Sequence, residues 1–248
     1  MIIIPARLSS TRFPNKILAD IQGEPMLIKT AKNASKIDEV CIACDDEGVL
    51  KLCKSAGVQA LITSKHHQSG TDRCNEAAKK LGLNSKEIII NIQADEPFLE
   101  SAVIESLKDI MQKGAWMGSC AKVISQSEIE NPNLVKVVLN KQNEAIYFSR
   151  ASVPFWRDKE SKNPPIYYGH LGVYGYSVES LAEFCALPNE LDSSPLEHIE
   201  KLEQLRAIYY GKRIQMAIVQ SQSIGIDTKE DLQRALERFG LQSCKGPS

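Results

Sequence analysis

The sequence predicts an α/β protein in which a mostly parallel sheet, flanked by helices, is extended by a mixed, strand-rich part. Two observations lead to this fold class. In the first 118 residues, short apolar runs rich in β-branched residues alternate with amphipathic segments, which is typical of βαβ units. After Gly118, strand-like segments follow one another without regular helices between them. We expect the 248 residues to form a single domain, because a chain of this length can bury one large core.

The first part, residues 1–118, contains four apolar runs with no alternation of apolar and polar residues, which predicts strands buried on both faces. Amphipathic segments between and after these runs predict helices. Right-handed connections place the loops after parallel strands along one edge, where open α/β sheets bind ligands, so we expect the ligand site of this part at that edge. The predicted strands are 2–5, 40–44, 58–62 and 88–92, and the predicted helices are 25–35, 47–56, 70–81 and 101–112.

The second part, residues 119–193, is predicted to extend the sheet into a mixed one. The segment 157–168 is charged and contains Pro164 and Pro165, which favours a loop. The predicted strands of this part are 119–124, 134–139, 145–149 and 172–176.

The third part, residues 194–240, begins with a helix start signal. Ser194 can act as the N-cap, Pro195 takes the first helical position, and Glu197 follows three residues after the cap. Helical periodicity places Glu203 inside an apolar arc, and a last helix is predicted at 229–239. The arc consists of Leu196, Ile199, Leu202, Leu205 and Ile208.

The charge balance argues against a nucleic-acid partner. The chain has 30 Lys and Arg against 31 Asp and Glu, so it lacks the basic surplus that nucleic-acid binding requires. No apolar run approaches the roughly 18 residues of a membrane span. The start, M-I-I-I-P, has no charged leader before Pro5, so we expect a cytoplasmic protein without a membrane partner.

The cysteines point to a reducing compartment, because seven of them are scattered through apolar stretches. Cys41 and Cys44 form a C-x-x-C pair, which is a possible redox motif or zinc half-site. The pair lies in an apolar run without a second Cys or His pair at zinc spacing, which favours buried strand residues.

A basic loop follows the first predicted strand. Arg7, Arg12 and Lys16 lie within ten residues, separated partly by small hydroxyl residues whose backbone N–H groups can be exposed. Such a loop suits a polyphosphate, although a solvated basic loop is the alternative. The chain has neither a Walker motif nor G-x-G-x-x-G, which argues against a P-loop kinase and an NAD dehydrogenase.

Two aspartates are candidate metal ligands. Asp95 follows the strand at 88–92, and Asp227 follows a short apolar run that we predict to be a strand. Mg²⁺ prefers one or two carboxylates together with phosphate oxygens and water. Each residue also has a structural alternative, in which Asp95 caps the next turn and Asp227 is the N-cap of the last helix.

Two further segments contain polar candidates. The segment H-H-Q-S-G-T-D-R precedes a predicted helix, whose N-terminus would favour anionic ligand groups. His170 enters a predicted strand, and Tyr174 should face the same side four residues later. A buried structural histidine is the alternative interpretation of His170.

Together these segments identify a resemblance that runs in order from Ile2 to about Arg238. The chain resembles the 3-deoxy-manno-octulosonate (Kdo) cytidylyltransferases. It departs from their pattern at Asn15 and Ala94, where glycines are usual, and at Gly169 and Ser177, where basic residues are frequent. The stretches S-P-L-E-H-I-E-K-L-E-Q-L-R and S-R-A-S-V-P are specific to these enzymes, whereas the basic loop is shared with related nucleotidyltransferases. Further matching segments are H-Q-S-G-T-D-R, N-I-Q-A-D-E-P, G-H-L-G-V-Y-G-Y and G-I-D-T-K-E-D-L.

The resemblance implies roles for individual residues. Arg7, Arg12 and Lys16 would hold the triphosphate, and Asp95 and Asp227 would hold Mg²⁺; of these, Arg7, Lys16, Asp95 and Asp227 form the catalytic group. The remaining nucleotide-binding residues would be Gln68, Ser69, Gly70 and Arg73, and the sugar-binding residues would be Arg150, His170, Tyr174, Glu203 and Gln204.

The resemblance also implies a reaction: CTP and Kdo give CMP-Kdo and pyrophosphate, a step of lipopolysaccharide biosynthesis, with Mg²⁺ as cofactor and a homodimer as the assembly. Two alternatives remain at this point. In the first, the acceptor is another sugar acid, such as sialic acid or 8-amino-Kdo; in the second, the chain binds a nucleotide without catalysis. A base preference for cytosine rests on the resemblance alone.

Overall fold

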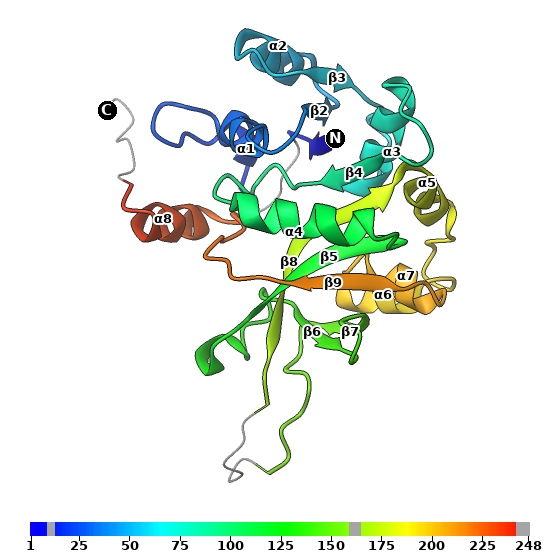
Figure 1. Cartoon of the computed structure of the whole chain (residues 1–248). Helices are drawn as coiled ribbons and strands as arrows, with labels where there is room; N and C mark the ends of the chain where they lie inside the picture. Colours follow the sequence, from blue (N-terminus) through cyan, green and yellow to red (C-terminus); the bar gives the residue numbers. More distant parts are fainter. Residues whose placement is uncertain (9–12, 159–164, 242–248) are drawn as a thin grey trace.

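The computed structural model describes residues 1–8, 13–158 and 165–241, and it confirms the α/β fold (Figure 1). The described strands form one sheet in the order β3-β2-β1-β4-β8-β5-β9, and β6 pairs with β7 and β8. The strands are β1 (Ile2–Ala6), β2 (Val40–Cys44), β3 (Ala60–Ile62), β4 (Ile88–Asn91), β5 (Met117–Val123), β6 (Lys136–Leu139), β7 (Ala145–Ser149), β8 (Tyr168–Ser177) and β9 (Ile214–Ile218). The α-helices are α1 (Met26–Ala34), α2 (Glu47–Ser55), α3 (Gly70–Lys80), α4 (Ser101–Gln112), α5 (Val178–Ala186), α6 (Pro195–Glu200), α7 (Leu205–Tyr209) and α8 (Lys229–Arg238), and short 3-10 helices are η1 (Lys16–Leu18) and η2 (Gln126–Glu128).

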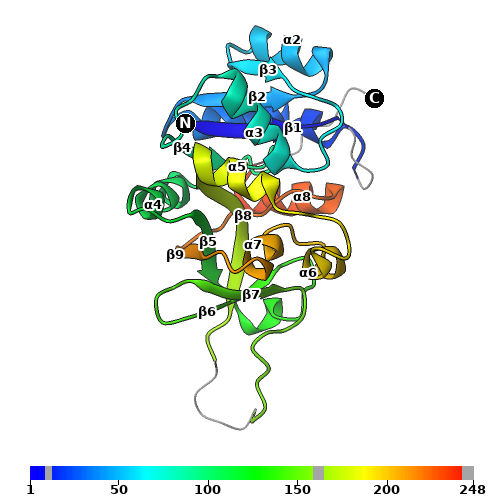
Figure 2. The same cartoon turned by 90° about the vertical axis from the view of Figure 1, so that its right-hand side faces the viewer.

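The strands of the first part are parallel, and β1, β2 and most of β4 are buried as predicted, whereas the edge strand β3 is only half-buried. Strand β1 lies between β2 and β4, and both pairings are parallel. Ile2 and Ile4 belong to the core beneath α1, α2 and α4, whereas Ile3 belongs to the core beneath α3, α5 and α7. Figure 2 shows α3 and α5 on the face of the sheet turned toward the viewer. All eight predicted elements of this part are present, with bounds that differ by at most two residues.

The strand-rich second part makes the sheet mixed, because β8 runs antiparallel to both β4 and β5. All four predicted strands are present, but β8 is longer than the predicted 172–176. The expectation that no helix lies in this part is wrong. Helix α5 follows β8 directly, with Ser177 as its N-cap in a capping box, and it buries Leu181 and Phe184. That cap and the apolar spacing were signals for a helix.

The third part differs most from the prediction. The helix predicted from Ser194 is two short helices, because Lys201 adopts a left-handed conformation with φ of 54° and ends α6. Ile199, predicted to face the core, is 75% exposed. Ser194 is the N-cap residue, but its hydroxyl donates to the side chain of Glu197 instead of capping the backbone. Strand β9 was not predicted. Among the described helices, none combines the length and the apolar character needed to span a membrane.

Candidate active site

A cavity of about 430 Å³ opens at the carboxyl ends of β1 and β4, which is the edge of the sheet where we predicted ligand binding. It brings together three predicted segments that are far apart in the chain: the basic loop, the N-terminus of α3 and the turn after β4. Arg12 lies outside the described residues. The predicted residues that line the cavity are Arg7, Lys16, Gln68, Ser69, Gly70, Arg73, Asp95 and Asp227.

Lys16 links the two candidate metal ligands. Its Nζ lies 2.5 Å from Oδ2 of Asp95 and 3.0 Å from Oδ1 of Asp227. Burial alone would lower the pKa of Lys16, but the two carboxylates outweigh it and raise that pKa above its usual value. Asn15, just before Lys16, has φ of 54°, a left-handed conformation that glycine adopts freely and asparagine tolerates. This geometry explains why glycine suits that position.

Asp227 reaches the site from an irregular segment, which corrects the prediction that it ends a strand. Residues 219–227 lie between β9 and α8 without regular structure. The backbone N–H of Ile226 donates to the carbonyl oxygen of Asp95 at 3.1 Å, which joins the two segments directly. Thr228, rather than Asp227, is the N-cap of α8 and forms a capping box with Asp231, so the N-cap alternative for Asp227 is wrong.

The first turn of α3 lies against the same cavity. Ser69 is the N-cap and accepts a hydrogen bond from the backbone N–H of Asp72. A Cβ on Gly70 would lie 3.0 Å from Cγ of Pro5, so a glycine allows the helix to begin close to the end of β1. The positive end of the α3 dipole is thereby placed beside Lys16 and Arg7, which favours anions in the cavity.

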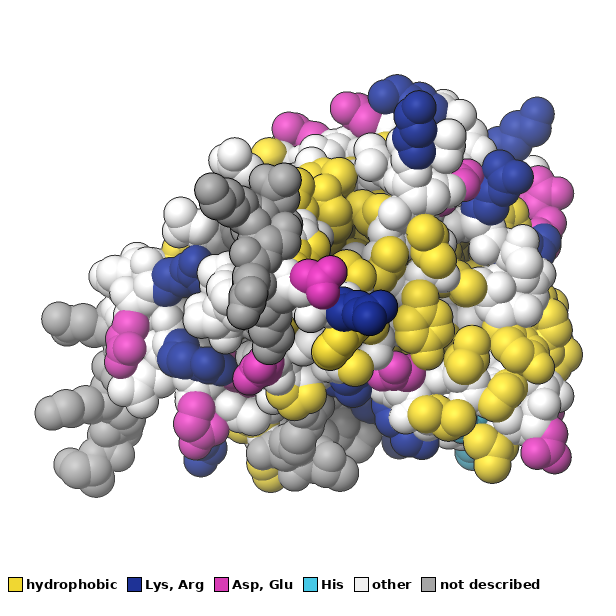
Figure 3. Space-filling model, turned by 90° about the horizontal axis from the view of Figure 1, so that it is seen from below, with side chains coloured by type: hydrophobic (Ala, Val, Ile, Leu, Met, Phe, Trp, Pro, Cys, Tyr) yellow, Lys and Arg dark blue, Asp and Glu magenta, His cyan; other side chains and the backbone are white. Residues whose placement is uncertain are grey.

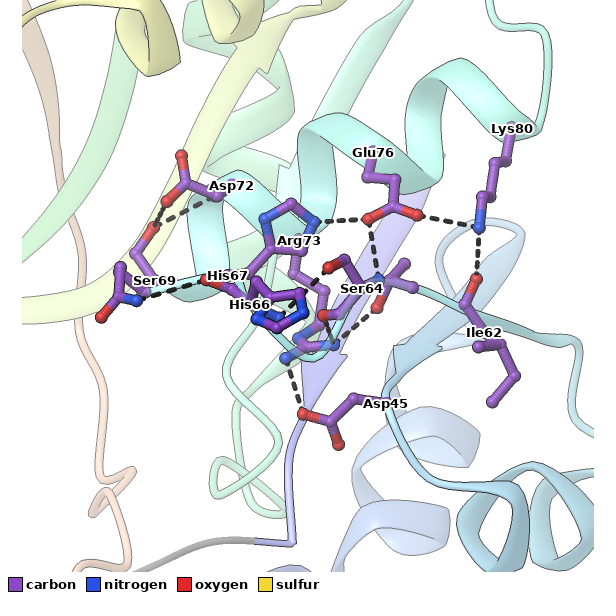
Figure 4. A network of polar contacts seen from close by, with 12 residues as sticks. Asp45, Ile62, Ser64, His66, His67, Ser69, Asp72, Arg73, Glu76 and Lys80 are labelled. Atoms are coloured by element: carbon purple, nitrogen blue, oxygen red, sulfur yellow. Dashed lines mark hydrogen bonds and ion pairs between the residues drawn. The ribbon is translucent and has the colours of Figure 1, made fainter.

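Arg73 lines the cavity but is already held by its neighbours. It is 3% exposed, and its guanidinium donates to Asp45 at 2.8 Å and to the hydroxyl of Thr63 at 2.6 Å. Figure 4 shows the guanidinium between Asp45 and the backbone of Ser64, with His67 and Glu76 paired nearby. These contacts fix the wall of the cavity on the β2 and β3 side.

The five residues predicted to bind the sugar acid do not line this cavity. His170 is buried, its Nε2 lies 2.9 Å from the hydroxyl of Ser119, and burial lowers its pKa to about 3. It is therefore a neutral, hydrogen-bonded histidine at physiological pH, a state that fits both a structural and a sugar-binding role. Its ring lies 5.5 Å from that of Tyr174, which confirms that the two side chains are adjacent. The guanidinium of Arg150 donates to backbone carbonyls of Pro132 and Glu200.

Glu203 and Gln204 lie in the turn between α6 and α7. Thr71, in the first turn of α3, donates to Oε2 of Glu203 at 2.6 Å, and Arg206 donates to Oε1 at 3.1 Å. Burial raises the pKa of Glu203, against the opposing effects of Thr71 and Arg206. Gln204 is 2% exposed; its Oε1 accepts from the hydroxyl of Tyr174, while its Nε2 has no hydrogen-bond partner among the described residues.

Two residues near the cavity were not singled out from the sequence. Gln93 lines it two residues before Asp95, and Thr71 joins α3 to Glu203. Gln93 lies within the strand-end motif N-I-Q-A-D-E-P, which was a usable signal, whereas nothing in the sequence pairs Thr71 with a residue 132 positions away.

The residues present fit a magnesium ion bound with a nucleotide. Asp95 and Asp227 converge on one ammonium group, and no third His, Cys, Asp or Glu joins them as a metal-binding cluster within the described ranges. Two carboxylates leave the remaining coordination positions for phosphate oxygens and water, as Mg²⁺ prefers. Cys41 and Cys44 are buried in β2, and burial raises the pKa of the Cys41 thiol to about 11. Their assignment as strand residues is confirmed.

The fold, together with a cationic cavity and two convergent carboxylates, defines a nucleotidyltransferase. The chain belongs to the cytidylyltransferase family, whose model matches residues 1–214. Among named relatives, it is 54% identical over 240 residues to 3-deoxy-manno-octulosonate cytidylyltransferase of Helicobacter pylori. This alignment covers 96% of this chain and 97% of the relative. A protein of the same name from Wolinella succinogenes is 52% identical over 246 residues, which covers 97% of this chain and 99% of the relative.

Solved structures agree with this family. A CMP:2-keto-3-deoxy-manno-octonic acid synthetase in complex with CTP is similar with a TM-score of 0.87 and 34% identity, over 96% of this chain and 97% of that chain. A putative glucose-1-phosphate thymidylyltransferase from Bacillus anthracis, at 14% identity and a TM-score of 0.63 over 99% of this chain and 97% of that chain, shows the shared fold alone.

Proposed function

We propose that this chain transfers CMP from CTP to Kdo and releases pyrophosphate. The observation that carries the proposal is the convergence of Lys16, Asp95 and Asp227 at the N-terminus of α3. It is supported by relatives at 54% identity that are named for this reaction and by a similar enzyme solved with CTP.

The chain's own residues position the nucleotide and stabilise charge. In the proposed reaction, the anomeric 2-hydroxyl of Kdo attacks the α-phosphorus and releases its proton to solvent, while the bond from the α-phosphorus to the oxygen of the β-phosphate breaks. Negative charge therefore grows on the departing pyrophosphate. Arg7, Lys16 and the backbone N–H groups at the start of α3 lie where they would neutralise that charge. Asp95 and Asp227 would hold Mg²⁺, which supplies Lewis-acid polarisation of the α-phosphate when it is bound.

The sugar acid would bind beside the turn between α6 and α7. Within the part of the chain that the structure describes, Nε2 of Gln204 is a buried donor without a hydrogen-bond partner, and such a group favours an oxygen of a ligand. Glu203, held by Thr71 and Arg206, would accept from sugar hydroxyl groups. Tyr174, neutral His170 and Arg150 would complete the sugar side.

We further propose a cytoplasmic homodimer that serves lipopolysaccharide biosynthesis. The face shown in Figure 3 has apolar side chains gathered on its right-hand side. Exposed apolar residues of the described chain include Ile146 in β7, which is 53% exposed, and Phe155, which is 81% exposed. An apolar surface of this kind favours association with a second copy. Sedimentation at micromolar concentration should give a dimer, and a monomer would contradict this assembly.

A pyrophosphate-release assay tests the proposed reaction. With CTP, we expect turnover with Kdo to exceed turnover with sialic acid and 8-amino-Kdo. With Kdo, we expect CTP to exceed UTP, ATP and GTP. A higher rate with another sugar acid would change the acceptor, a preference for a purine nucleotide would contradict the family assignment of the base, and nucleotide binding without turnover would favour a non-catalytic protein.

A further inference from the structure

The segment that bears Asp227 has no regular structure, yet it delivers a carboxylate to within 3.0 Å of Lys16 Nζ. Fixing the backbone of an irregular segment costs conformational entropy at every residue. The backbone N–H of Val219 still donates to the carbonyl oxygen of Ala121 in β5, but no strand pairing continues through residues 220–226. Other contacts must therefore order this segment.

Two charged side chains hold its first half. Glu100 accepts hydrogen bonds from the hydroxyl of Ser221 at 2.7 Å and from the backbone N–H of Gln222 at 2.6 Å. Lys122 donates from Nζ to the carbonyl oxygens of Ser221 at 3.4 Å and Ser223 at 3.3 Å. The carboxylate and the ammonium thus satisfy donors and acceptors of the same short stretch of backbone.

Glu96 holds the second half, and it directly follows Asp95 in the chain. It accepts from the hydroxyl of Ser223 at 2.7 Å, and Ser223 is 5% exposed. A Cβ on Gly225 would lie 3.0 Å from Oε1 of Glu96, so the segment packs closely on this carboxyl group. Ile226 is fully buried and donates its N–H to the carbonyl of Asp95.

We propose that Glu96, Glu100 and Lys122 are positioning residues that hold Asp227 opposite Asp95 and so set the affinity of the site for a divalent cation. The proposal rests on the proposed metal role of Asp227. The turn that follows β4 would then have two roles. It would supply the metal-binding carboxylate of Asp95 and, in Glu96, the anchor for the segment that carries Asp227.

Ser223→Ala tests the proposal, because it removes the hydrogen bond to Glu96 and leaves every charge in place. Ser125→Ala is a matched control, since Ser125 also donates to a glutamate oxygen at 2.7 Å but lies in the capping box of η2. Three quantities are measured for each variant. They are the Mg²⁺ concentration that gives half-maximal pyrophosphate release, the amount of Mn²⁺ bound in the presence of CTP, detected by electron paramagnetic resonance, and the melting temperature. Hydrogen bonds to charged groups suggest a shift of about tenfold in metal affinity for Ser223→Ala.

The expected result is weaker Mg²⁺ and Mn²⁺ binding in Ser223→Ala, with kcat restored at high Mg²⁺, and unchanged metal dependence in Ser125→Ala. In Ser223→Ala/Asp227→Asn, the serine change should add nothing to the aspartate change, because the positioned carboxylate is gone. A lower melting temperature with wild-type metal dependence in Ser223→Ala would overturn the positioning role. Wild-type metal dependence in Asp227→Asn would instead reject the metal site itself, and the positioning role with it.

Discussion

The parallel first part and the region after residue 118 place their candidate residues in different ways. In the first part, Asp95 lies in the short turn that follows β4, and Ser69 and Gly70 lie at the start of α3. In the later region, Glu203 lies in a turn between two short helices and Asp227 in an irregular segment. Regular elements position residues through backbone pairing, whereas these later segments depend on individual side-chain contacts. Loss of a single side-chain hydrogen bond should therefore displace a candidate residue of the later region more readily than one of the first part.

Lys16→Ala should cause the largest loss among the variants outside the metal site. It removes the cation that lies between Asp95 and Asp227 and, in the proposed reaction, contacts the departing pyrophosphate. Loss of one charge-assisted contact costs roughly 1.5–3 kcal/mol, or about 10- to 150-fold in kcat/KM for CTP. Steady-state kinetics measure the effect, with Lys79→Ala on the exposed side of α3 as the control. Wild-type kinetics in Lys16→Ala would contradict a role of Lys16 in binding the triphosphate and would favour a solvated basic loop.

Thr71→Val should produce a smaller and more selective loss, because it removes the contact between α3 and Glu203 while keeping the side-chain volume. Loss of this hydrogen bond should raise KM for the sugar acid roughly tenfold. The affinity for CTP alone, measured by calorimetry, should stay unchanged, and Thr71→Ser should restore the sugar-acid KM. Equal losses for both substrates would show that Thr71 supports the first part instead of the sugar side.

His170 predicts a pH dependence of stability. Burial lowers its pKa from 6.5 to about 3, so in this range the unfolded chain binds more protons than the folded one. Its neutral form therefore contributes stability above pH 6.5 that is lost as the pH falls toward 3. Between pH 7 and pH 5, the wild type should lose about 2 kcal/mol of unfolding free energy relative to His170→Gln. Urea titrations at both pH values measure this difference, and parallel pH curves would contradict the burial of a neutral imidazole.

Much of the first part could be predicted from the sequence, because strands buried on both faces leave a clear apolar pattern. Asp95 was placed correctly for this reason. Glu203 was expected on the inner face of a helix, and it is turned inward, but the chain bends at Lys201 and Thr71 holds the carboxylate from another element. No local pattern encodes a left-handed lysine or a contact across 132 residues. The convergence of Asp227 with Asp95 was also predicted, although through a strand that does not form.

The central prediction is that Asp95 and Asp227 together bind Mg²⁺. It is tested most directly by magnesium titrations of activity and thermal melts of Asp95→Asn, Asp227→Asn and the double variant. Asparagine keeps the size of the side chain and removes the charge that holds Mg²⁺ against its hydration shell. If the two carboxylates share one ion, each single variant should lose nearly all activity with its fold preserved, and the double variant should be scarcely worse than either, because residues that act as a unit are non-additive. Full activity in Asp227→Asn, or modest stability losses that add while turnover in magnesium stays near normal, would contradict the shared site.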